Sequence, residues 1–375
     1  MALAPRRRTA PGNRSLKVGL DARKADDFGI GTYIRGVVLA ASRVRPAWEF
    51  VLVGAPHGHS IEAPNISSTA PLGGGYGPAD IASLSSAARC IGADVFHAPH
   101  YVTPIGLDIP LVVTIHDCIH LRFPEYLPRP LGVLPGGLSR RYARWLMRRA
   151  PRIAEHVIAV SEATRSDVID LLETDPGHVT TVHNGVDAFW SATSETEVSK
   201  RSTSIFWVGN PKLHKGLDVL LDAFNAVAAE VPSAKLVLAG AEVLDEHVAS
   251  HPFRERIDCL GFVSPEQLRD LYRSAGVVCV PSRHEGFGLP ALEAMAAGAP
   301  LIATAVGGVP EVVGDAGVLV PAESTSKLAT ELQRVLADAP EAERLGANAR
   351  ARAATFSWTR CAEATCRILE QAATR

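Results

Sequence analysis

The sequence predicts an α/β protein built from two doubly wound, Rossmann-like domains that face a cleft. Short, almost wholly apolar, β-branched runs alternate with helical patterns, which is typical of parallel sheets covered on both faces. The alternation stops at residues 191–204, a polar gap rich in Ser, Thr and Glu, and then starts again. The chain has 375 residues, 47% of them hydrophobic, which is enough for two aliphatic cores. Ligands of such sheets bind beyond the carboxyl ends of the strands, so we expect functional residues just after strands.

The expected strands fall in two series, one on either side of the polar gap. Before the gap, apolar runs predict strands at residues 16–22, 49–54, 94–99, 110–117 and 156–161. After the gap, they predict strands at residues 204–210, 234–240, 256–263, 276–282, 300–304 and 317–321. Helical patterns lie between them, for example at residues 216–232. The basic residues 1–15 lack the apolar segment of a signal peptide, so we expect them to form a disordered leader.

Composition excludes several classes of protein. Lys and Arg number 38 against 40 Asp and Glu, so the chain lacks the basic excess of a general nucleic-acid binder, and we expect no nucleic-acid partner. The six cysteines form no C-x-x-C pair and lie mostly in apolar runs, which favours buried, reduced thiols in a cytoplasmic protein without a metal site. No run of 18 apolar residues predicts a membrane-spanning helix, so any membrane contact would be made from the side.

The stretch SRHEGFGLPALEAMAAGAP, residues 282–300, joins an expected strand to an expected helix through a loop that contains glycine. Pro290 suits the first helical position, and Gly298 suits the end of the helix. Gly286 and Gly288 let the backbone come close to a ligand. Unpaired amides at a helix N-terminus favour an anion such as a diphosphate. The amides in that position belong to Phe287, Gly288 and Leu289.

Two carboxylates flank this loop. Glu293 is expected in the first turn of the helix, where it can accept two hydrogen bonds from a ribose diol. Glu285 precedes the glycines and is expected to point into the cleft, toward a sugar. The alternative interpretation is that Glu293 only balances the helix dipole and that Glu285 is a solvated loop acid.

Glu285 and Glu293 form an E-x7-E pair within EGFGLPALEAMAAGAPLIAT, which is followed by GGVPEVV. This stretch resembles the nucleotide-sugar motif of the retaining glycosyltransferases of family four, which have the GT-B fold. The segments FGIGTYI, VTIHD, VIAVSEATRSDVI, TTVHNGVD and VGNPKLHKGLDVLLDAF are also similar to family segments in order and spacing. The resemblance extends from residue 16 to residue 370. It implies an acceptor-side domain of residues 16–190 plus the returning C-terminal helix, 357–375, and a nucleotide-sugar-binding domain of residues 204–356.

The resemblance also implies roles for individual residues. Glu293 would bind the nucleotide ribose, Glu285 would contact a hydroxyl of the donor sugar, and the amides of residues 287–289 would reach the sugar and diphosphate. His116 would hydrogen-bond the donor sugar from the opposite domain, with a core histidine as the alternative. Asp117 would either orient His116 or cap the next segment. In the glycine loop after the first strand, Gly29 and Gly31 would allow close approach to the diphosphate or the acceptor.

Lys215 would be the cation that holds the diphosphate, whose negative charge grows as the glycosidic bond breaks. The family usually places an Arg near this Lys, either just after the strand or directly before the Lys. This chain has Asn210 and His214 at those two places. The cation clamp is therefore weaker than in the family or is completed by a neighbour. The neighbouring candidates are Lys212, His214 and Arg283.

The implied reaction is retaining hexosyl transfer to a saccharide or lipid-linked acceptor in cell-surface polysaccharide, lipopolysaccharide or glycolipid assembly. The donor would be GDP-mannose, which VGNPKLHKG slightly favours, or a UDP-hexose. Residues 260–272 resemble the segment whose backbone holds the base. The donor is a substrate, and neither a metal nor a cofactor is implied, because helix dipoles and Lys215 can take the place of a divalent ion. The acceptor would lie near residues 56–80, a Gly/Pro/Ser-rich stretch expected to be a mobile loop.

The stretch LSRRYARWLMRRAPR, residues 138–152, carries six arginines from Arg140 to Arg152 with apolar residues between them. As a helix it has a basic side and an apolar side. One interpretation is docking onto an anionic membrane surface, at the inner face of the cell membrane, to reach a lipid-linked acceptor. The other is a solvated helix that packs its apolar stripe on its own domain.

Two other functions remain open from the sequence. A non-hydrolysing 2-epimerase of a UDP-amino sugar has the same fold, although the E-x7-E pair disfavours it. A non-catalytic sugar-nucleotide-binding subunit stays open because the family Arg is missing beside Lys215.

Overall fold

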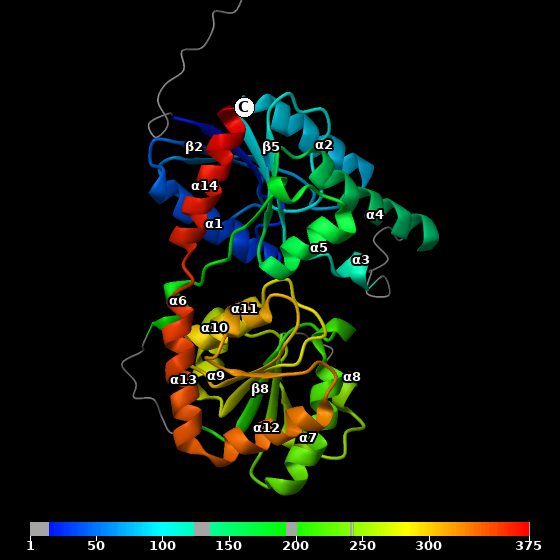
Figure 1. Cartoon of the computed structure of the whole chain (residues 1–375), viewed down its shortest axis with the longest axis vertical. Coiled ribbons are helices and arrows are strands. Elements are labelled where there is room, and N and C mark those ends of the chain that lie inside the picture. Colours follow the sequence, from blue (N-terminus) through cyan, green and yellow to red (C-terminus); the bar gives the residue numbers. More distant parts are fainter. Residues whose placement is uncertain (1–14, 124–135, 193–200, 241, 243, 375) are drawn as a thin grey trace, which may run out of the picture.

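Two parallel β-sheets form the cores of two domains, which lie one above the other along the long axis of the molecule (Figure 1). The computed structural model describes residues 15–123, 136–192, 201–240, 242 and 244–374, so the expected leader up to residue 14 lies outside the described residues. All pairs of neighbouring strands are parallel. The prediction of two doubly wound α/β domains is confirmed.

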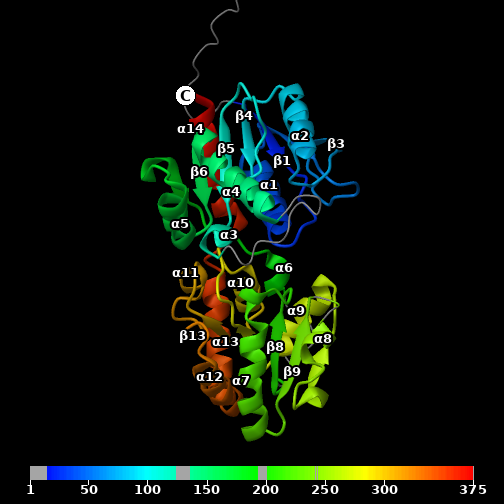
Figure 2. The ribbon, with the colours of Figure 1, turned by 90° about the vertical axis from the view of Figure 1, so that its right-hand side faces the viewer.

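The N-terminal domain contains a seven-stranded sheet in the order β3-β2-β1-β4-β5-β6-β7. Its strands are β1 (Lys17–Asp21), β2 (Glu49–Gly54), β3 (Ile66–Pro71), β4 (Val95–Ala98), β5 (Leu111–Ile115), β6 (His156–Ala159) and β7 (Val179–Thr181). One face is covered by α1 (Ile30–Val44) and α14 (Trp358–Thr374). The other is covered by α2 (Pro78–Cys90), α4 (Gly136–Ile153) and α5 (Glu162–Leu172), as Figure 2 shows. The short helix α3 (Ile119–Arg122) also belongs to this domain, whereas α6 (Ala188–Ser191) packs against α10 of the C-terminal domain.

The C-terminal domain contains a six-stranded sheet in the order β10-β9-β8-β11-β12-β13. Its strands are β8 (Ser204–Val208), β9 (Lys235–Ala239), β10 (Ile257–Cys259), β11 (Val277–Val280), β12 (Leu301–Thr304) and β13 (Val318–Val320). The core of one face includes α7 (Leu217–Glu230), α8 (Leu244–Val248) and α12 (Thr325–Ala337). The core of the other includes α9 (Pro265–Ser274), α10 (Leu289–Ala296) and α11 (Val309–Val313). Helix α13 (Ala339–Ala353) contributes to both cores. The strand order reverses between β8 and β11, the position where such sheets bind ligands.

The expectation that residues 56–80 form one mobile loop is wrong. They contain the edge strand β3 at Ile66–Pro71 and the start of α2 at Pro78. The strand escaped prediction because its sequence, ISSTAP, is mostly exposed and has no apolar run. Strand β7 was missed as well, because its sequence, VTT, contains only one apolar residue.

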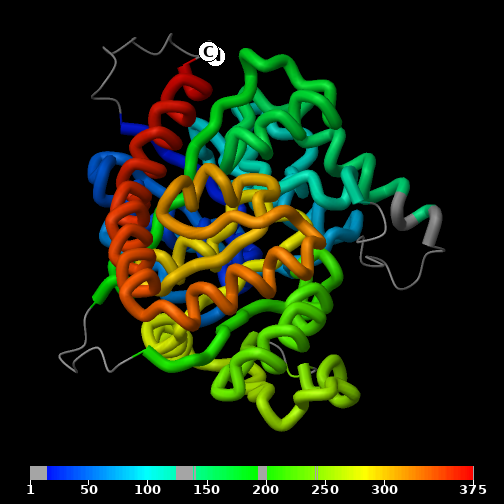
Figure 3. The backbone as a smooth tube through the Cα atoms, turned by 60° about the horizontal axis from the view of Figure 1, so that its bottom comes forward, coloured from blue at the N-terminus to red at the C-terminus, as the bar shows by residue number. Residues whose placement is uncertain are grey.

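The chain crosses between the domains twice, and the two crossings touch. Val186 and Ser357 form a parallel bridge, and Val186 N donates to Phe356 O at 3.4 Å. Phe356 is buried in the C-terminal core, while Trp358 packs against the N-terminal core, so the two rings anchor the crossing. Figure 3 shows α14 in red beside α1 in blue, which matches the contact between these helices. In the part of the chain that the structure describes, no helix is long and apolar enough to span a membrane.

Candidate functional site

The loop between β11 and α10, residues 281–288, leads into the N-terminus of α10, where backbone amides are available to donate hydrogen bonds to a ligand. Gly288 bounds α10 with a φ of 101°, a left-handed conformation that favours glycine. The helix begins at Leu289, so Pro290 is its second residue rather than its first. The hydrogen bond from Leu292 N to Gly288 O, 3.1 Å long, is the first of the helix, and the amides before it have no helical acceptor. The amides of residues 287–289 can therefore receive an anion.

Lys215 and Glu285 form an ion pair between the loops that follow β8 and β11. Lys215 Nζ lies 2.7 Å from Glu285 Oε1, and Ser282 Oγ donates to the same oxygen at 2.8 Å. The loops meet because Gly216, with a φ of 66°, packs against Pro281 O; an added Cβ would lie 2.0 Å from that oxygen. Burial tends to raise the pKa of Glu285, but the charge and hydrogen bond of Lys215, with help from Ser282, lower it below its ordinary value. Glu285 is therefore ionised beside its cation.

Glu293 lies in the second turn of α10, not in the first as expected, because the helix starts at Leu289, one residue earlier than the sequence suggested. Tyr272, from α9, donates its hydroxyl to Glu293 Oε2 at 3.5 Å. Burial raises the pKa of Glu293 to about 8, while the Tyr272 hydrogen bond opposes the rise. Near neutral pH the carboxyl is mostly protonated, and a ligand with two hydroxyl donors would favour its ionised form.

His116 follows β5 at the side of the N-terminal domain that faces the other domain. Its Nε2 lies 3.0 Å from Pro99 O, and because a carbonyl only accepts, Nε2 carries the proton. Burial lowers the pKa of His116 despite the opposing effects of that hydrogen bond and of Asp117, so the ring is neutral and Nδ1 keeps a lone pair. Tyr33 packs edge-on against the ring, with centroids 4.9 Å apart. Asp117 Oδ1 accepts from Ile119 N at 3.0 Å, which is the capping role among its two predicted roles.

The two domains meet at Gly286. A Cβ on this residue would lie 1.8 Å from His116 O, so only glycine lets the backbone of the C-terminal domain come this close to the other domain. The sequence suggested that Gly286 makes room for a ligand, but the carbonyl of His116 occupies that room. The contact brings the peptide of His116 next to the peptide that follows Glu285. The backbones of two residues predicted to face the donor sugar from opposite domains therefore lie close together.

The sequence also predicted donor contacts for Gly29, Gly31, Asn210 and Lys212. Gly29 precedes α1 with a φ of 73°, is exposed, and would have no atom within 4 Å of an added Cβ. Gly31 differs, because its Cβ would lie 2.4 Å from Ala25 O; packing of the preceding loop on α1 explains this glycine without a ligand. Asn210 and Lys212 are exposed in the segment after β8, where a ligand can reach them.

Arg283 does not complete the cation clamp. Its guanidinium forms a bidentate ion pair with Asp218, at 2.8 and 2.7 Å, and a further bond with Glu323 at 2.7 Å. His214 does not supply a charge either, because burial above all lowers its pKa to about 4. Of the three neighbouring candidates, Lys212 remains.

Three aromatic residues at the site were missed by the sequence analysis. Phe28 and Phe262 come from opposite domains, with ring planes parallel to within 1° and centroids 6.3 Å apart. Phe28 is 89% exposed and Phe262 is 58% exposed, so both keep open faces for a planar group. Tyr272 stands out only through its contact with Glu293. A usable signal was present for the pair, because each Phe adjoins a glycine in a predicted ligand loop.

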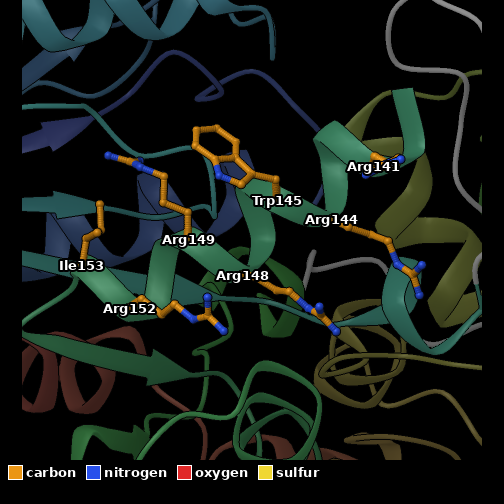
Figure 4. A pocket seen from close by; sticks show the side chains of 7 residues that line it. All are labelled: Arg141, Arg144, Trp145, Arg148, Arg149, Arg152 and Ile153. Atoms are coloured by element: carbon orange, nitrogen blue, oxygen red, sulfur yellow. The ribbon is translucent and has the colours of Figure 1, made fainter. Parts of the chain in front are cut away.

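A second candidate site lies on α4, where a surface hollow of about 530 Å³ is found. Trp145 is 49% exposed, whereas Leu146 and Met147 are buried in the domain. Figure 4 shows the guanidinium groups of Arg144 and Arg148 on the side of the helix away from Trp145. An apolar stripe packs inward while arginines face out, which agrees with a helix that packs on its own domain, and docking onto a membrane stays a prediction. The hollow is lined by Arg141, Arg144, Trp145, Arg148, Arg149, Arg152 and Ile153.

Comparison with known proteins shows that a glycosyltransferase family model matches each half of the chain. Residues 36–188 match the family model described as Glycosyltransferase Family 4, and residues 189–352 match the model described as Glycosyl transferases group 1. Both motif-bearing regions, around His116 and around the E-x7-E pair, lie within these matches.

Three curated relatives match most of the chain. A D-inositol 3-phosphate glycosyltransferase of Xylanimonas cellulosilytica is 33% identical over 72% of this chain and 68% of its own length. An MMP alpha-(1->4)-mannosyltransferase of Mycolicibacterium hassiacum is 31% identical over 76% of this chain and 70% of its own. The O-antigen chain mannosyltransferase B of Escherichia coli is 28% identical over 72% of each chain.

Solved structures share the fold over almost the whole chain. The sucrose-phosphate synthase of Thermosynechococcus elongatus superposes with a TM-score of 0.78 at 20% identity, covering 96% of this chain and 99% of that one. Anabaena HepE, in complex with UDP and glucose, gives a TM-score of 0.72 at 20% identity, covering 95% of this chain and all of that one. With the family models and the identity to curated relatives, these findings show that the protein belongs to the family 4 glycosyltransferases and has their GT-B fold.

Proposed function

We propose that this glycosyltransferase moves a hexose, with mannose favoured, from a nucleotide sugar to a saccharide or lipid-linked acceptor with retention of anomeric configuration. The observation that carries the proposal is the Lys215–Glu285 ion pair at the start of α10, with the peptide of His116 packed beside it. One small region thereby offers a cation, helix-start amides and polar groups from two domains. A nucleoside diphosphate sugar needs this combination.

The donor is proposed to lie along the carboxyl edge of the second sheet. Its diphosphate would bind Lys215 and the amides of residues 287–289, with Asn210 and Lys212 nearby. The ribose would donate to Glu293, and the base would lie toward residues 260–263. The sugar would reach the neighbourhood of Glu285, where a hydroxyl can donate to Nδ1 of His116. Gly29 would face the donor from the other domain.

The arrangement of charge supports the proposal of retaining transfer. As the bond between the anomeric carbon and the diphosphate oxygen breaks, negative charge grows on the diphosphate, where Lys215 and the amides stabilise it. The acceptor hydroxyl oxygen bonds the anomeric carbon on the same face and gives its proton to the departing phosphate oxygen. Glu285 is already paired with Lys215, so its proposed role is to hold the sugar rather than to attack it. Determining the anomeric configuration of the product by NMR tests this point, and an inverted product would contradict it.

No metal ion and no cofactor is proposed to take part, and the nucleotide sugar is a substrate. The helix-start amides and Lys215 supply positive charge to the diphosphate by themselves. Transfer should therefore continue at the same rate in excess EDTA. A loss of transfer that Mg²⁺ or Mn²⁺ restores would overturn this part of the proposal.

The names of the relatives support mannose as the transferred sugar. Two of them, from Mycolicibacterium hassiacum and Escherichia coli, are named as mannosyltransferases. HepE, whose fold this chain shares, was crystallised with UDP-glucose, which supports a nucleotide-sugar donor. We therefore place GDP-mannose before a UDP-hexose as donor. The O-antigen relative supports an acceptor in polysaccharide or lipopolysaccharide assembly.

The arginine-rich face of α4 is proposed to hold the protein on the cytoplasmic side of an anionic membrane. Arg141, Arg144 and Arg148 are exposed on a helix that also carries the half-exposed Trp145, a residue type that favours the membrane interface. The net charge of the chain is −2, so attraction to an anionic surface has to be local. Such docking would present a lipid-linked acceptor to the enzyme.

Thermal unfolding against GDP-, UDP-, ADP- and dTDP-sugars tests the donor assignment. A ligand at about a hundred times its Kd adds roughly 2.7 kcal/mol of stability. We expect GDP-mannose to raise the Tm of the protein and to lose this effect in Glu293→Ala. A response to no nucleotide sugar would contradict the donor assignment. Conversion of a UDP-amino sugar in the absence of any acceptor would instead indicate an epimerase.

A further inference from the structure

The N-terminus of α5 holds the β11–α10 loop of the other domain through side-chain hydroxyls. Ser161 Oγ donates to Gly286 O at 2.6 Å. Thr164 Oγ1 lies 3.2 Å from Gly286 O and 3.3 Å from His116 O, so one hydroxyl is shared between the two domains. Ser161 and Thr164 are almost fully buried, at 0% and 2% exposure. The carbonyl of Gly286 is therefore fixed relative to the backbone of His116, which follows β5.

A carboxylate from the C-terminal domain binds the same helix end. Glu311, in α11, accepts from Glu162 N at 2.8 Å and from Ala163 N at 2.9 Å, and it also bonds His183 Nε2 at 3.0 Å. Burial tends to raise the pKa of Glu311, but the bonds from His183 and the two amides lower it below its ordinary value. The carboxylate is thus ionised at the positive end of α5, a favourable placement.

Glycines permit this approach at two points. Gly286 packs against His116 O, as described above. At Gly308, which precedes α11, an added Cβ would lie 2.5 Å from Gly286 O and 2.9 Å from Ser161 Cβ. Neither residue has a positive φ, so the reason for glycine at both is the close packing rather than the local backbone conformation. Backbone from the two domains is therefore in direct contact around Gly286.

We infer that Ser161, Thr164 and Glu311 form an interdomain clasp that sets the position of the β11–α10 loop against His116. They are positioning residues, since they act through the peptides of His116 and Gly286 rather than on the substrate. The inference rests on the proposed function, in which the donor sugar lies between these two peptides. A shift of about 1 Å in such a site can lower a rate by about a hundredfold. The groups proposed to bind the nucleotide, however, lie in the C-terminal domain, apart from Gly29.

This placement predicts that weakening the clasp lowers the rate of transfer but leaves nucleotide binding almost unchanged. Glu311→Gln replaces one acceptor oxygen by an amide NH2, so one of the two α5 amides loses its partner. We expect the kcat of transfer to fall at least about tenfold while the Kd of the nucleoside diphosphate changes less than about twofold. Glu341→Gln is the matched control, because Glu341 pairs with Arg334 and Arg344 of its own domain, and it should leave both quantities unchanged. Equal losses of binding and turnover in Glu311→Gln would overturn the inference.

Gly286→Ala provides a second, steric test. The new methyl group meets atoms of the N-terminal domain, so the domains have to separate while the C-terminal domain keeps its fold. X-ray scattering should report a larger radius of gyration, and hydrogen exchange at the amides of Glu162 and Ala163 should become faster. Both readouts are independent of the donor, so they distinguish a failed clasp from a failed donor assignment. An unchanged radius and unchanged exchange in both Gly286→Ala and Glu311→Gln would refute the clasp. Thr164→Ser, which keeps the hydroxyl, should retain the protection of these two amides from hydrogen exchange, whereas Thr164→Ala should lose it.

Discussion

Lys215 Nζ and Glu285 Oε1 lie 2.7 Å apart, although 70 residues separate them in the chain. The donor diphosphate is proposed to share this cation, so Lys215→Gln removes charge stabilisation where the leaving group forms. We expect kcat to fall by about 10²–10³. Glu285, 10% exposed, would lose its ion-pair partner, and its pKa would rise. Steady-state kinetics with the donor that stabilises the protein measures the loss.

Lys235→Gln is the control for that variant, since Lys235 begins β9 and is exposed. Its kinetics should match those of the unmodified enzyme. Lys212→Gln tests the remaining candidate for the second cation, and we expect it to raise the KM of the donor several-fold. If Lys215→Gln retains full kcat, the proposed diphosphate site is wrong.

Glu293 should make the stability of the protein depend on pH. The folded protein holds this proton up to about pH 8, whereas the unfolded chain releases it near 4.5. The free energy of unfolding should therefore decrease from about pH 5 to pH 8 relative to Glu293→Gln, by on the order of 2–4 kcal/mol. Denaturant titrations of both proteins at several pH values measure the difference. A difference that is constant with pH would show that Glu293 titrates normally.

Nucleotide binding should release a proton from Glu293. Two ribose hydroxyls donate best to the ionised carboxylate, so the bound ligand lowers the pKa of this group below about 8. Calorimetry at pH 7 in buffers of different ionisation enthalpy should reveal release of up to about one proton, which is absent in Glu293→Gln. Affinity should increase with pH until the free carboxyl is ionised. Proton uptake would contradict the ribose role.

His116 should affect transfer but not nucleotide binding. Its Nε2 proton is held by Pro99 O, and its Nδ1 is left as an acceptor for a sugar hydroxyl. We expect His116→Ala to lower kcat by about a hundredfold and to leave the Kd of the nucleoside diphosphate within about twofold. His116→Asn, which offers an amide oxygen as acceptor, should recover part of the rate. Unchanged turnover in His116→Ala would favour the alternative of a core histidine.

Phe262 should contribute to binding of the base. Its ring is exposed and parallel to that of Phe28, so a base can stack on it as the domains close around the donor. Stacking of one base is worth about 1–3 kcal/mol, so Phe262→Ala should raise the Kd of the nucleoside diphosphate about tenfold. The affinity for pyrophosphate should not change. Leu260→Ala is the control, because it removes an exposed but non-aromatic side chain of the same segment.

The arginines of α4 should control binding to anionic vesicles. Each arginine near such a surface contributes about 1 kcal/mol, so replacing Arg141, Arg144 and Arg148 by Gln should weaken partitioning about a hundredfold. Co-sedimentation with vesicles of phosphatidylglycerol and phosphatidylcholine, compared with phosphatidylcholine alone, measures the effect. Arg334→Gln in the other domain should bind like the unmodified protein. Equal binding to both kinds of vesicle would contradict an electrostatic contact.

The strands show which elements a sequence pattern can predict and which it cannot. The run EFVLVG predicted β2 to the residue, because a buried parallel strand is apolar on both faces. The segment ISSTAP did not reveal β3, because an edge strand with exposed side chains carries no such signal. The sequence placed the start of α10 at Pro290, one residue after its actual start at Leu289. Glu293 was consequently assigned to the first turn instead of the second.

By itself, the sequence determined the two-domain α/β architecture, the resemblance to family 4 and the residues to examine, because alternating apolar runs and short motifs are local properties of the chain. Only the tertiary structure decided how those residues are used. Arg283 binds Asp218 and Glu323 instead of facing a ligand, Gly286 makes room for a carbonyl of the other domain, and Glu311 binds the end of α5. Each of these contacts joins segments 40 or more residues apart. No local pattern encodes such contacts, because the partner of a polar or glycine residue is fixed only when two distant surfaces pack together.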